Sequence, residues 1–163
     1  MSERANYRRT LLTAGVAGVA SAAIVAGEAS GQSAPVMNDP DVVREVTAEF
    51  AGYDQALGKN DVAALNNYFF DSPGTVRFGI SEILFGSSEI RAFRSASAGL
   101  GGVPKREHTV INSYGRDFAT VATLSHPRAP GKITRTMQTW VRLSQGWRIV
   151  AAHVSTIDEP VRP

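Results

Sequence analysis

The sequence predicts an α+β domain in which about three helices pack against one curved antiparallel sheet. Apolar residues recur every three or four positions between residues 40 and 58, which is typical of a helix with one buried face. Residues 106–155 instead form four long runs rich in β-branched and aromatic residues, separated by turns. Because these four runs follow one another, we expect neighbouring antiparallel strands with the helices gathered on one side.

The first helix is expected to run from Pro40 to Gly58. Asp39 can cap its first turn, and proline suits that turn because its missing N–H would have no partner there. Glycine commonly ends a helix, which favours Gly58 as the stop. One face is predicted to be buried, because its apolar residues step by three and four: Val43, Val46, Phe50, Tyr53 and Leu57.

Shorter elements are expected between the first helix and the four long strands. Asp61 can cap a second helix that reaches about residue 69, and a strand is predicted at residues 75–80. A short strand at residues 83–85 precedes a third helix, for which Ser87 is the expected cap.

The four long strands are predicted at residues 106–114, 118–126, 132–143 and 147–155. The turn at residues 144–146 indicates a hairpin between the last two. The final strand is apolar on both alternations apart from Arg148 and His153, so we expect it to be buried on both faces. A twisted sheet that wraps the first helix would enclose a cone-shaped cavity, the usual place for a small ligand.

Four polar residues of the last two strands are candidates for substrate contacts: Arg135, Gln138, His153 and Ser155. His153 is expected to share a face with Ser155 and Trp147, because these positions differ by even numbers. Arg135 and Gln138 differ by an odd number, so both can line one pocket only if a bulge intervenes. A histidine in such a place is more often a core residue than a ligand, and both interpretations stay open.

Tyr53 and Arg77 are the candidate catalytic residues. Tyr53 lies on the apolar face of the first helix, where a tyrosine is often a core residue whose hydroxyl finds a backbone partner. Arg77 interrupts a largely apolar strand. If it is buried, its guanidinium needs an anion, and its planar fork suits a carboxylate. On a solvated edge it would be an ordinary surface arginine, and the residues alone leave this open.

The composition narrows the classes of function. The 163 residues carry a net charge of +2 without a block of like charges, so we expect no nucleic-acid partner. The absence of cysteine excludes disulfides and thiolate chemistry. The three histidines lie on separate segments without ligand spacing, so we expect neither a metal site nor another cofactor. No nucleophile elbow accompanies His153, which leaves serine-hydrolase chemistry with little support.

The first 36 residues are expected to be an export signal and linker. Residues 7–12, Tyr-Arg-Arg-Thr-Leu-Leu, resemble the twin-arginine export motif, and a weakly apolar run rich in alanine and glycine follows. The alternative is a stably inserted helix, but such a run inserts poorly. We therefore expect a periplasmic protein without a stable membrane anchor, with its domain at residues 37–158 and a tail at residues 159–163.

Six segments of the sequence form an ordered set. They are SPGTVRFG at 72–79, LFG at 84–86, IRAFR at 90–94, YGRDFAT at 114–120, QTWVR at 138–142 and GWRIVAAHVS at 146–155. Together they resemble the AtzH-like family, which belongs with the SnoaL-like proteins in the nuclear transport factor two-like superfamily. The resemblance covers about residues 38–157, nearly the whole expected domain.

This resemblance implies a cone-shaped fold, commonly a homodimer, and a decarboxylating amidohydrolase activity on a small carboxylated urea. It also implies that Tyr53 and Arg77 are catalytic. The function we expect is an exported small-molecule enzyme that hydrolyses a small carboxylated amide or urea held by an arginine. Two alternatives remain: a non-catalytic carboxylate-binding module, and another cone-fold enzyme such as an isomerase or dehydratase, which would need an aspartate or glutamate base.

Overall fold

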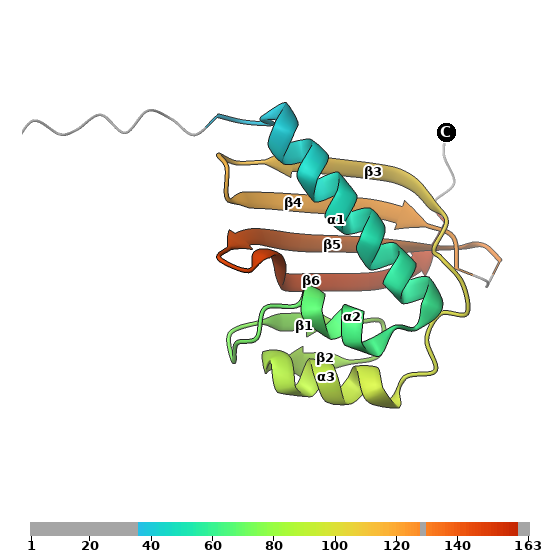
Figure 1. The fold of residues 1–163 in the computed structure, drawn as a ribbon. Helices are drawn as coiled ribbons and strands as arrows, with labels where there is room; N and C mark the ends of the chain where they lie inside the picture. The colour runs from blue at the N-terminus through green and yellow to red at the C-terminus, as the bar shows by residue number, and fades with distance from the viewer. Residues whose placement is uncertain (1–35, 128–129, 160–163) are drawn as a thin grey trace, which may run out of the picture. The chain divides into compact units, whose positions relative to one another are not determined.

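The computed structural model describes residues 36–127 and 130–159, so the predicted export signal lies outside the described residues. One six-stranded sheet, in the order β2-β1-β6-β5-β4-β3, is accompanied by three helices (Figure 1). The helices are α1 (Pro40–Lys59), α2 (Val62–Tyr68) and α3 (Gly86–Ala96). The strands are β1 (Val76–Phe78), β2 (Ile83–Phe85), β3 (Arg106–Ser113), β4 (Phe118–Ser125), β5 (Lys132–Leu143) and β6 (Gly146–Asp158). The predicted α+β class is confirmed.

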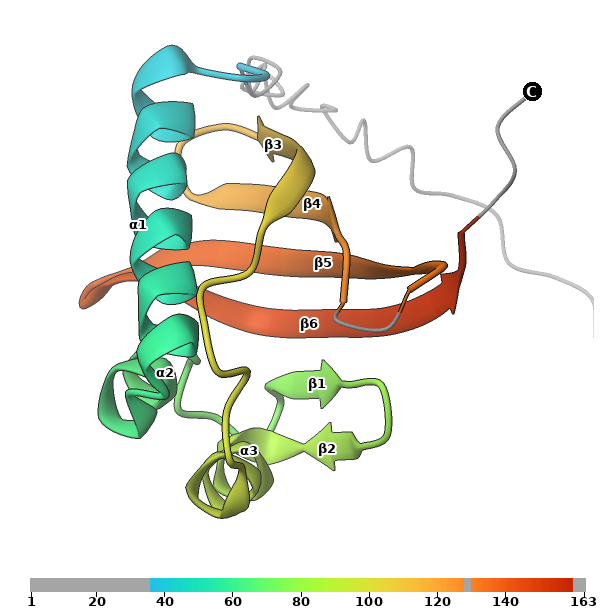
Figure 2. The ribbon, with the colours of Figure 1, turned by 90° about the vertical axis from the view of Figure 1, so that its right-hand side faces the viewer.

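The sheet is antiparallel except where β1 joins β6 in parallel. Figure 2 shows the curved strands β3–β6 with α1 along one side and α3 beside β1 and β2. We call the side of the sheet that packs against α1 the inner face, and the opposite side the outer face. Among the described residues, no helix is both long and apolar enough to cross a membrane.

Helix α1 begins as predicted but ends differently. The Asp39 carboxylate accepts a hydrogen bond from the Asp41 N–H at 3.0 Å, which caps the first turn. The helix continues past Gly58 and stops at Asn60, whose left-handed backbone (φ 52°) makes it the C-cap. Gly58 serves another purpose, because a Cβ there would lie 2.7 Å from the Val103 backbone nitrogen. The glycine therefore permits a close approach of the following loop.

A bulge in β6 reverses the predicted faces of that strand. Thr139 of β5 pairs with Ala151, but the next residue, Trp140, pairs with Ile149, so Val150 has no partner opposite it. Ile149 is fully buried in the core, whereas His153 is exposed. The prediction that His153 shares a face with Trp147 is therefore wrong, since one extra residue changes the side on which every later side chain lies.

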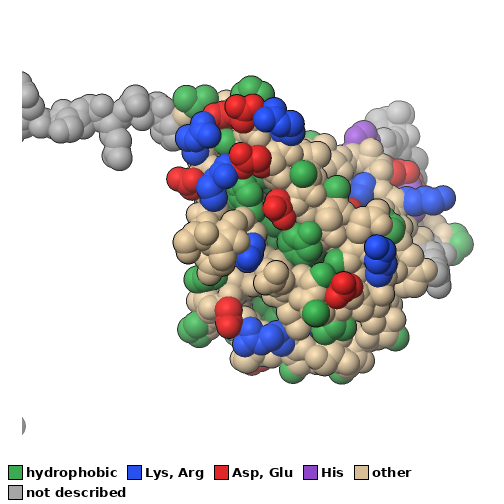
Figure 3. All heavy atoms as spheres, viewed as in Figure 1, with side chains coloured by type: hydrophobic (Ala, Val, Ile, Leu, Met, Phe, Trp, Pro, Cys, Tyr) green, Lys and Arg blue, Asp and Glu red, His purple; other side chains and the backbone are tan. Residues whose placement is uncertain are grey.

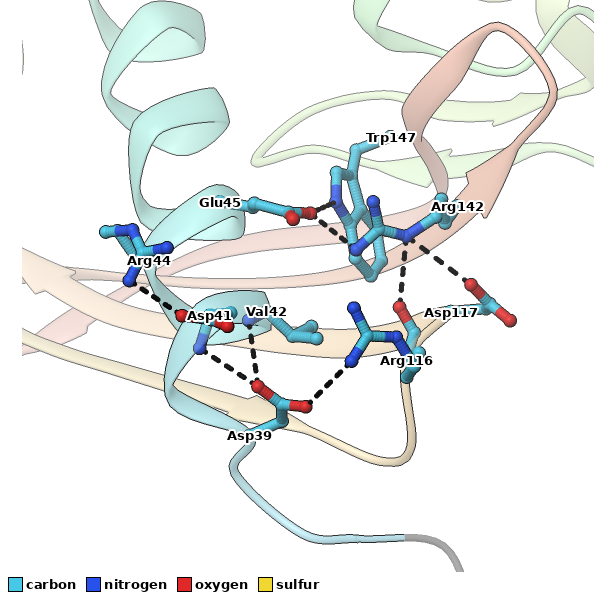
Figure 4. A network of polar contacts seen from close by, with 9 residues as sticks. All are labelled: Asp39, Asp41, Val42, Arg44, Glu45, Arg116, Asp117, Arg142 and Trp147. Atoms are coloured by element: carbon cyan, nitrogen blue, oxygen red, sulfur yellow. Dashed lines mark hydrogen bonds and ion pairs between the residues drawn. The ribbon is translucent and has the colours of Figure 1, made fainter.

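A polar network ties the start of α1 to the far edge of the domain (Figure 4). The Glu45 carboxylate accepts a hydrogen bond from the Trp147 indole at 3.1 Å and pairs with the Arg142 guanidinium at 2.5 Å. Arg142 also lies over the Trp147 ring at 4.8 Å. Figure 3 shows acidic and basic side chains intermixed near this end of α1.

We expect Glu45→Gln to lower the thermal unfolding midpoint at neutral pH, and the difference from the wild type to shrink in acid. Hydrogen bonds from Trp147 and Arg142 lower the pKa of Glu45 below its ordinary value. A carboxyl group whose pKa is depressed by folding stabilises the protein above its unfolded-state pKa. This contribution disappears as the pH falls through the folded-state pKa.

Thermal unfolding of both proteins from about pH 7 to about pH 3 measures this effect. Glu49→Gln, one turn along the same helix, is the matched control. A difference between Glu45→Gln and wild type that stays constant over the whole range would contradict the assignment.

Candidate functional site

Tyr53 is held inside the domain by aromatic neighbours. It lies on α1, is 5% exposed, and its ring meets those of Tyr68, Phe69 and Trp140 edge-on, with centroids 5.6, 6.4 and 6.5 Å away. Its hydroxyl oxygen accepts a hydrogen bond from Nη2 of Arg94 at 3.0 Å. Because the oxygen is the acceptor in that contact, the phenolic proton remains available to another acceptor.

Arg77 lies on β1 and points to the inner face. It pairs in register with Ala152, which pairs with Gln138 on the next strand, so all three side chains occupy one row. Its guanidinium is buried, forms an ion pair with Glu82, and lies over the Phe93 ring at 5.0 Å. The anion that a buried arginine requires is therefore supplied within the protein.

Gly79 makes the Arg77–Glu82 pair possible. The turn between β1 and β2 is closed by a hydrogen bond from the Gly79 N–H to the Glu82 carbonyl at 2.8 Å. A Cβ on Gly79 would lie 1.7 Å from a carboxylate oxygen of Glu82. The Glu82 side chain thus folds back over the glycine to reach the guanidinium.

Arg77 experiences two further groups of the site. Burial lowers the pKa of Arg77 to about 10, and the positive charge of Arg94 lowers it further, while Tyr53 acts in the opposite direction. The guanidinium still remains protonated at neutral pH. This coupling brings Tyr53, Arg77 and Arg94 together, from α1, β1 and α3.

Arg94 is a site residue that the sequence interpretation missed. We considered it a surface arginine at a cavity entrance, but it is only 7% exposed. It lies over the Phe69 ring at 5.9 Å, and among the described residues its Nε has no hydrogen-bond partner. The available signal was its spacing from Ile90, since residues four apart share a helix face.

Asp54 and Arg106 form a second buried ion pair beside Tyr53. Both oxygens of Asp54 accept hydrogen bonds from Arg106, from Nε at 3.0 Å and from Nη2 at 2.6 Å. The side chains are 10% and 14% exposed, respectively. This two-point contact joins α1 to β3 and satisfies both charges.

The four predicted substrate contacts divide between the two faces of the sheet. Gln138 lies on the inner face, is 1% exposed, and its Oε1 accepts a hydrogen bond from the Trp140 indole at 3.0 Å. Arg135, His153 and Ser155 lie on the outer face, and Arg135 Nε donates to Ser155 Oγ at 3.2 Å. The structure therefore does not bring these three residues together with Tyr53 and Arg77.

A hollow of about 450 Å³ on the outer face includes these three residues. His108 and Met137 also line it. A second hollow, of about 520 Å³, lies near α2 and includes Asn66, Arg91 and Arg148. Neither hollow is lined by Tyr53 or Arg77. Within the described ranges, no three histidine or acidic side chains gather as metal ligands would.

The fold and its site belong to a known structural class. A curved sheet around a long helix matches the nuclear transport factor two-like and cystatin-like proteins, including one from Salmonella enterica at 24% identity (TM-score 0.61, 75% of this chain and 96% of that one). The model of one family, AtzH-like, matches residues 35–160. The chain belongs to the AtzH-like family.

Two solved structures are more similar in sequence. A protein of unknown function from Pectobacterium atrosepticum is 47% identical, with a TM-score of 0.72, over 75% of this chain and 95% of that one. A cystatin-like fold protein from Burkholderia xenovorans is 45% identical, with a TM-score of 0.74, over 77% and 98%. No curated protein matches the sequence.

Proposed function

We propose that the domain is a small-molecule enzyme that hydrolyses the C–N bond of a small carboxylated amide or urea. One observation carries this proposal: a buried tyrosine hydroxyl is hydrogen-bonded to Arg94 and electrostatically coupled to Arg77. A proton donor next to two guanidiniums, in surroundings shielded from water, suits a reaction in which negative charge develops on oxygen.

The reaction has a simple balance. A water molecule attacks the carbonyl carbon and forms a C–O bond, while a guanidinium stabilises the charge on the carbonyl oxygen. The C–N bond then breaks. Tyr53 gives its proton to the departing nitrogen and regains one from the attacking water. The products are a carboxylic or carbamic acid and an amine or ammonia.

A second candidate is an isomerase or dehydratase. One observation favours it, because Glu82 provides a carboxylate near the site that sequence reasoning had not found. A carboxylate held by a guanidinium is a weak base, however, and Glu82 would have to leave Arg77 before accepting a proton. We therefore rank this candidate second.

A panel of small carboxylated amides, ureas and hydroxy acids, with detection of both ligand-induced thermal shifts and products, tests the proposal. Release of ammonia or an amine supports hydrolysis. Loss of water or a rearranged product would support the second candidate. Ligand-induced stabilisation without any product would instead indicate a non-catalytic carboxylate-binding module.

We also propose that the domain acts as a homodimer formed through the outer face. Several large apolar side chains of that face are exposed: Ile83, Phe85, Val110, Phe118 and Met137. Monomers rarely expose such a contiguous apolar surface. A second copy fits best, because a two-fold axis brings the same uncharged patch against itself.

For the N-terminal segment we propose export through the twin-arginine pathway, which rests on the sequence around Arg8 and Arg9. Replacing both residues with lysine is expected to retain the protein in the cytoplasm, since the pathway reads the arginine pair. Cell fractionation of the full chain in a bacterial host measures this. Unchanged appearance of the double variant in the periplasm would contradict the route.

A further inference from the structure

The interior of the domain contains more buried cations than buried anions among the residues that the structure describes. Three arginines have largely buried side chains: Arg77, Arg94 and Arg106. Arg77 pairs with Glu82, and Arg106 pairs with Asp54. Arg94 contacts only a neutral hydroxyl and an aromatic ring in that part of the chain. The site thus carries one positive charge without a countercharge.

A buried guanidinium in that condition is costly, because it has lost its hydration without gaining an anion. The cost is visible at the atomic level, since the Nε donor of Arg94 has no partner among the described residues. The Tyr53 hydroxyl satisfies one donor on Nη2 but supplies no charge. Natural proteins retain such an arrangement where a ligand completes it.

Arg94 also affects its surroundings as a charge. It lowers the pKa of Arg77, which means that two guanidiniums lie close enough to repel each other. Glu82 offsets the charge of Arg77 only. An anion bound to Arg94 would therefore relieve both the missing hydrogen bond and the repulsion.

We propose that Arg94 is the residue that binds the negatively charged group of the ligand, and that this group is a single carboxylate. The aromatic rings around Tyr53 restrict the occupant to a small molecule. The carboxylate accepts hydrogen bonds from Nε and the guanidinium fork of Arg94. It then lies next to the Tyr53 hydroxyl, and Arg77 keeps its Glu82 partner.

This inference extends the proposed hydrolase function by naming the group that holds the substrate carboxylate. It does not require turnover, so the two can fail separately. If malonate binds in an Arg94-dependent way and no amide or urea is hydrolysed, the anion site stands and the hydrolase proposal falls. If hydrolysis occurs but is insensitive to Arg94, the reverse holds.

Calorimetric titration of the full chain with malonate tests the proposal, with malonamide as the uncharged analogue. We expect malonate to bind and malonamide to bind at least tenfold more weakly, on the order of the loss of one charge-assisted hydrogen bond. Arg94→Met is expected to weaken malonate binding by about tenfold to a hundredfold. Arg94→Lys keeps the charge without the fork, and we expect an intermediate affinity.

Arg91→Met is the matched control, because Arg91 lies on the same helix but is exposed and paired with Asp71. Its malonate affinity is expected to equal that of the wild type. A structural role for Arg94 predicts a different result, namely that Arg94→Met unfolds at a lower temperature without ligand. We expect its ligand-free midpoint to be no lower than that of the wild type, since an unpaired buried charge has been removed.

Three results would overturn the proposal. The first is equal malonate affinity for the wild type and Arg94→Met. The second is the absence of malonate binding to the wild type. The third is a loss of binding in Arg91→Met as large as that in Arg94→Met. If Arg94→Met does not fold, Arg94→Lys with malonate and malonamide decides, because wild-type affinity in that variant would equally contradict a role for the guanidinium fork.

Discussion

Tyr53→Phe is expected to abolish turnover while leaving the fold and carboxylate binding nearly unchanged. The substitution removes only the hydroxyl, and the ring can still pack against Tyr68, Phe69 and Trp140. The reaction loses its proton donor to the departing nitrogen, an effect on the order of a hundredfold to ten-thousandfold in kcat. Steady-state kinetics with a substrate from the panel, together with malonate titration, separates the loss of chemistry from a loss of binding.

Tyr68→Phe is the matched control. Tyr68 belongs to the same aromatic cluster, but its hydroxyl lies over Gly52, where a Cβ would be 2.3 Å from that oxygen. We expect this variant to keep nearly full activity. If Tyr53→Phe turned over substrate as fast as the wild type, the Tyr53 hydroxyl would have no part in the reaction.

Met137→Asp is expected to convert a dimer into a monomer. Met137 is 56% exposed and lies on the outer face of β5, among the apolar residues that we propose as the interface. Because a two-fold interface presents each residue twice, one substitution introduces two carboxylates. Burying each without a partner costs several kcal/mol, so the dimer dissociation constant should rise at least about a hundredfold.

Sedimentation equilibrium of the full chain over a range of concentrations measures this change. Ser144→Asp, in the exposed turn between β5 and β6, is the control and should remain a dimer. A wild-type chain that sediments as a monomer at every concentration would contradict the proposed dimer. A dimer that Met137→Asp leaves intact would place the interface elsewhere.

Periodicity predicted most of the fold correctly because local spacing reflects which side of an element is buried. The face of α1 that includes Val46, Phe50 and Tyr53 is buried as its three- and four-residue steps indicated. The four long strands were found for the same reason, since their composition favours sheets. The residue types and their local order suffice for such elements.

Features that depend on distant partners were not predictable in this way. The bulge at Val150 arises from the pairing of β5 with β6, and no residue type marks it in the sequence. It moved His153 and Ser155 to the outer face. The third helix also begins at Gly86 without a side-chain cap, because Ser87 instead donates to the Asp71 carboxylate at 2.5 Å.

The composition of the candidate site was predictable only in part. Tyr53 and Arg77 were identified from their positions within apolar segments and from the family resemblance. Glu82 was missed because its contact with Arg77 requires the chain to reverse over Gly79. Arg94 was missed because an arginine near the end of a helix is usually solvated, and only the packing of α3 shows that this one is buried.

A crystal structure of the full chain with bound malonate tests the central claim most directly, namely that the interior of the domain binds a small carboxylate beside Tyr53. We predict a carboxylate within hydrogen-bonding distance of Arg94 Nε and the Tyr53 hydroxyl, with Glu82 still paired to Arg77. Malonate bound instead beside Arg135 and His153 on the outer face, with nothing at Arg94, would contradict the account.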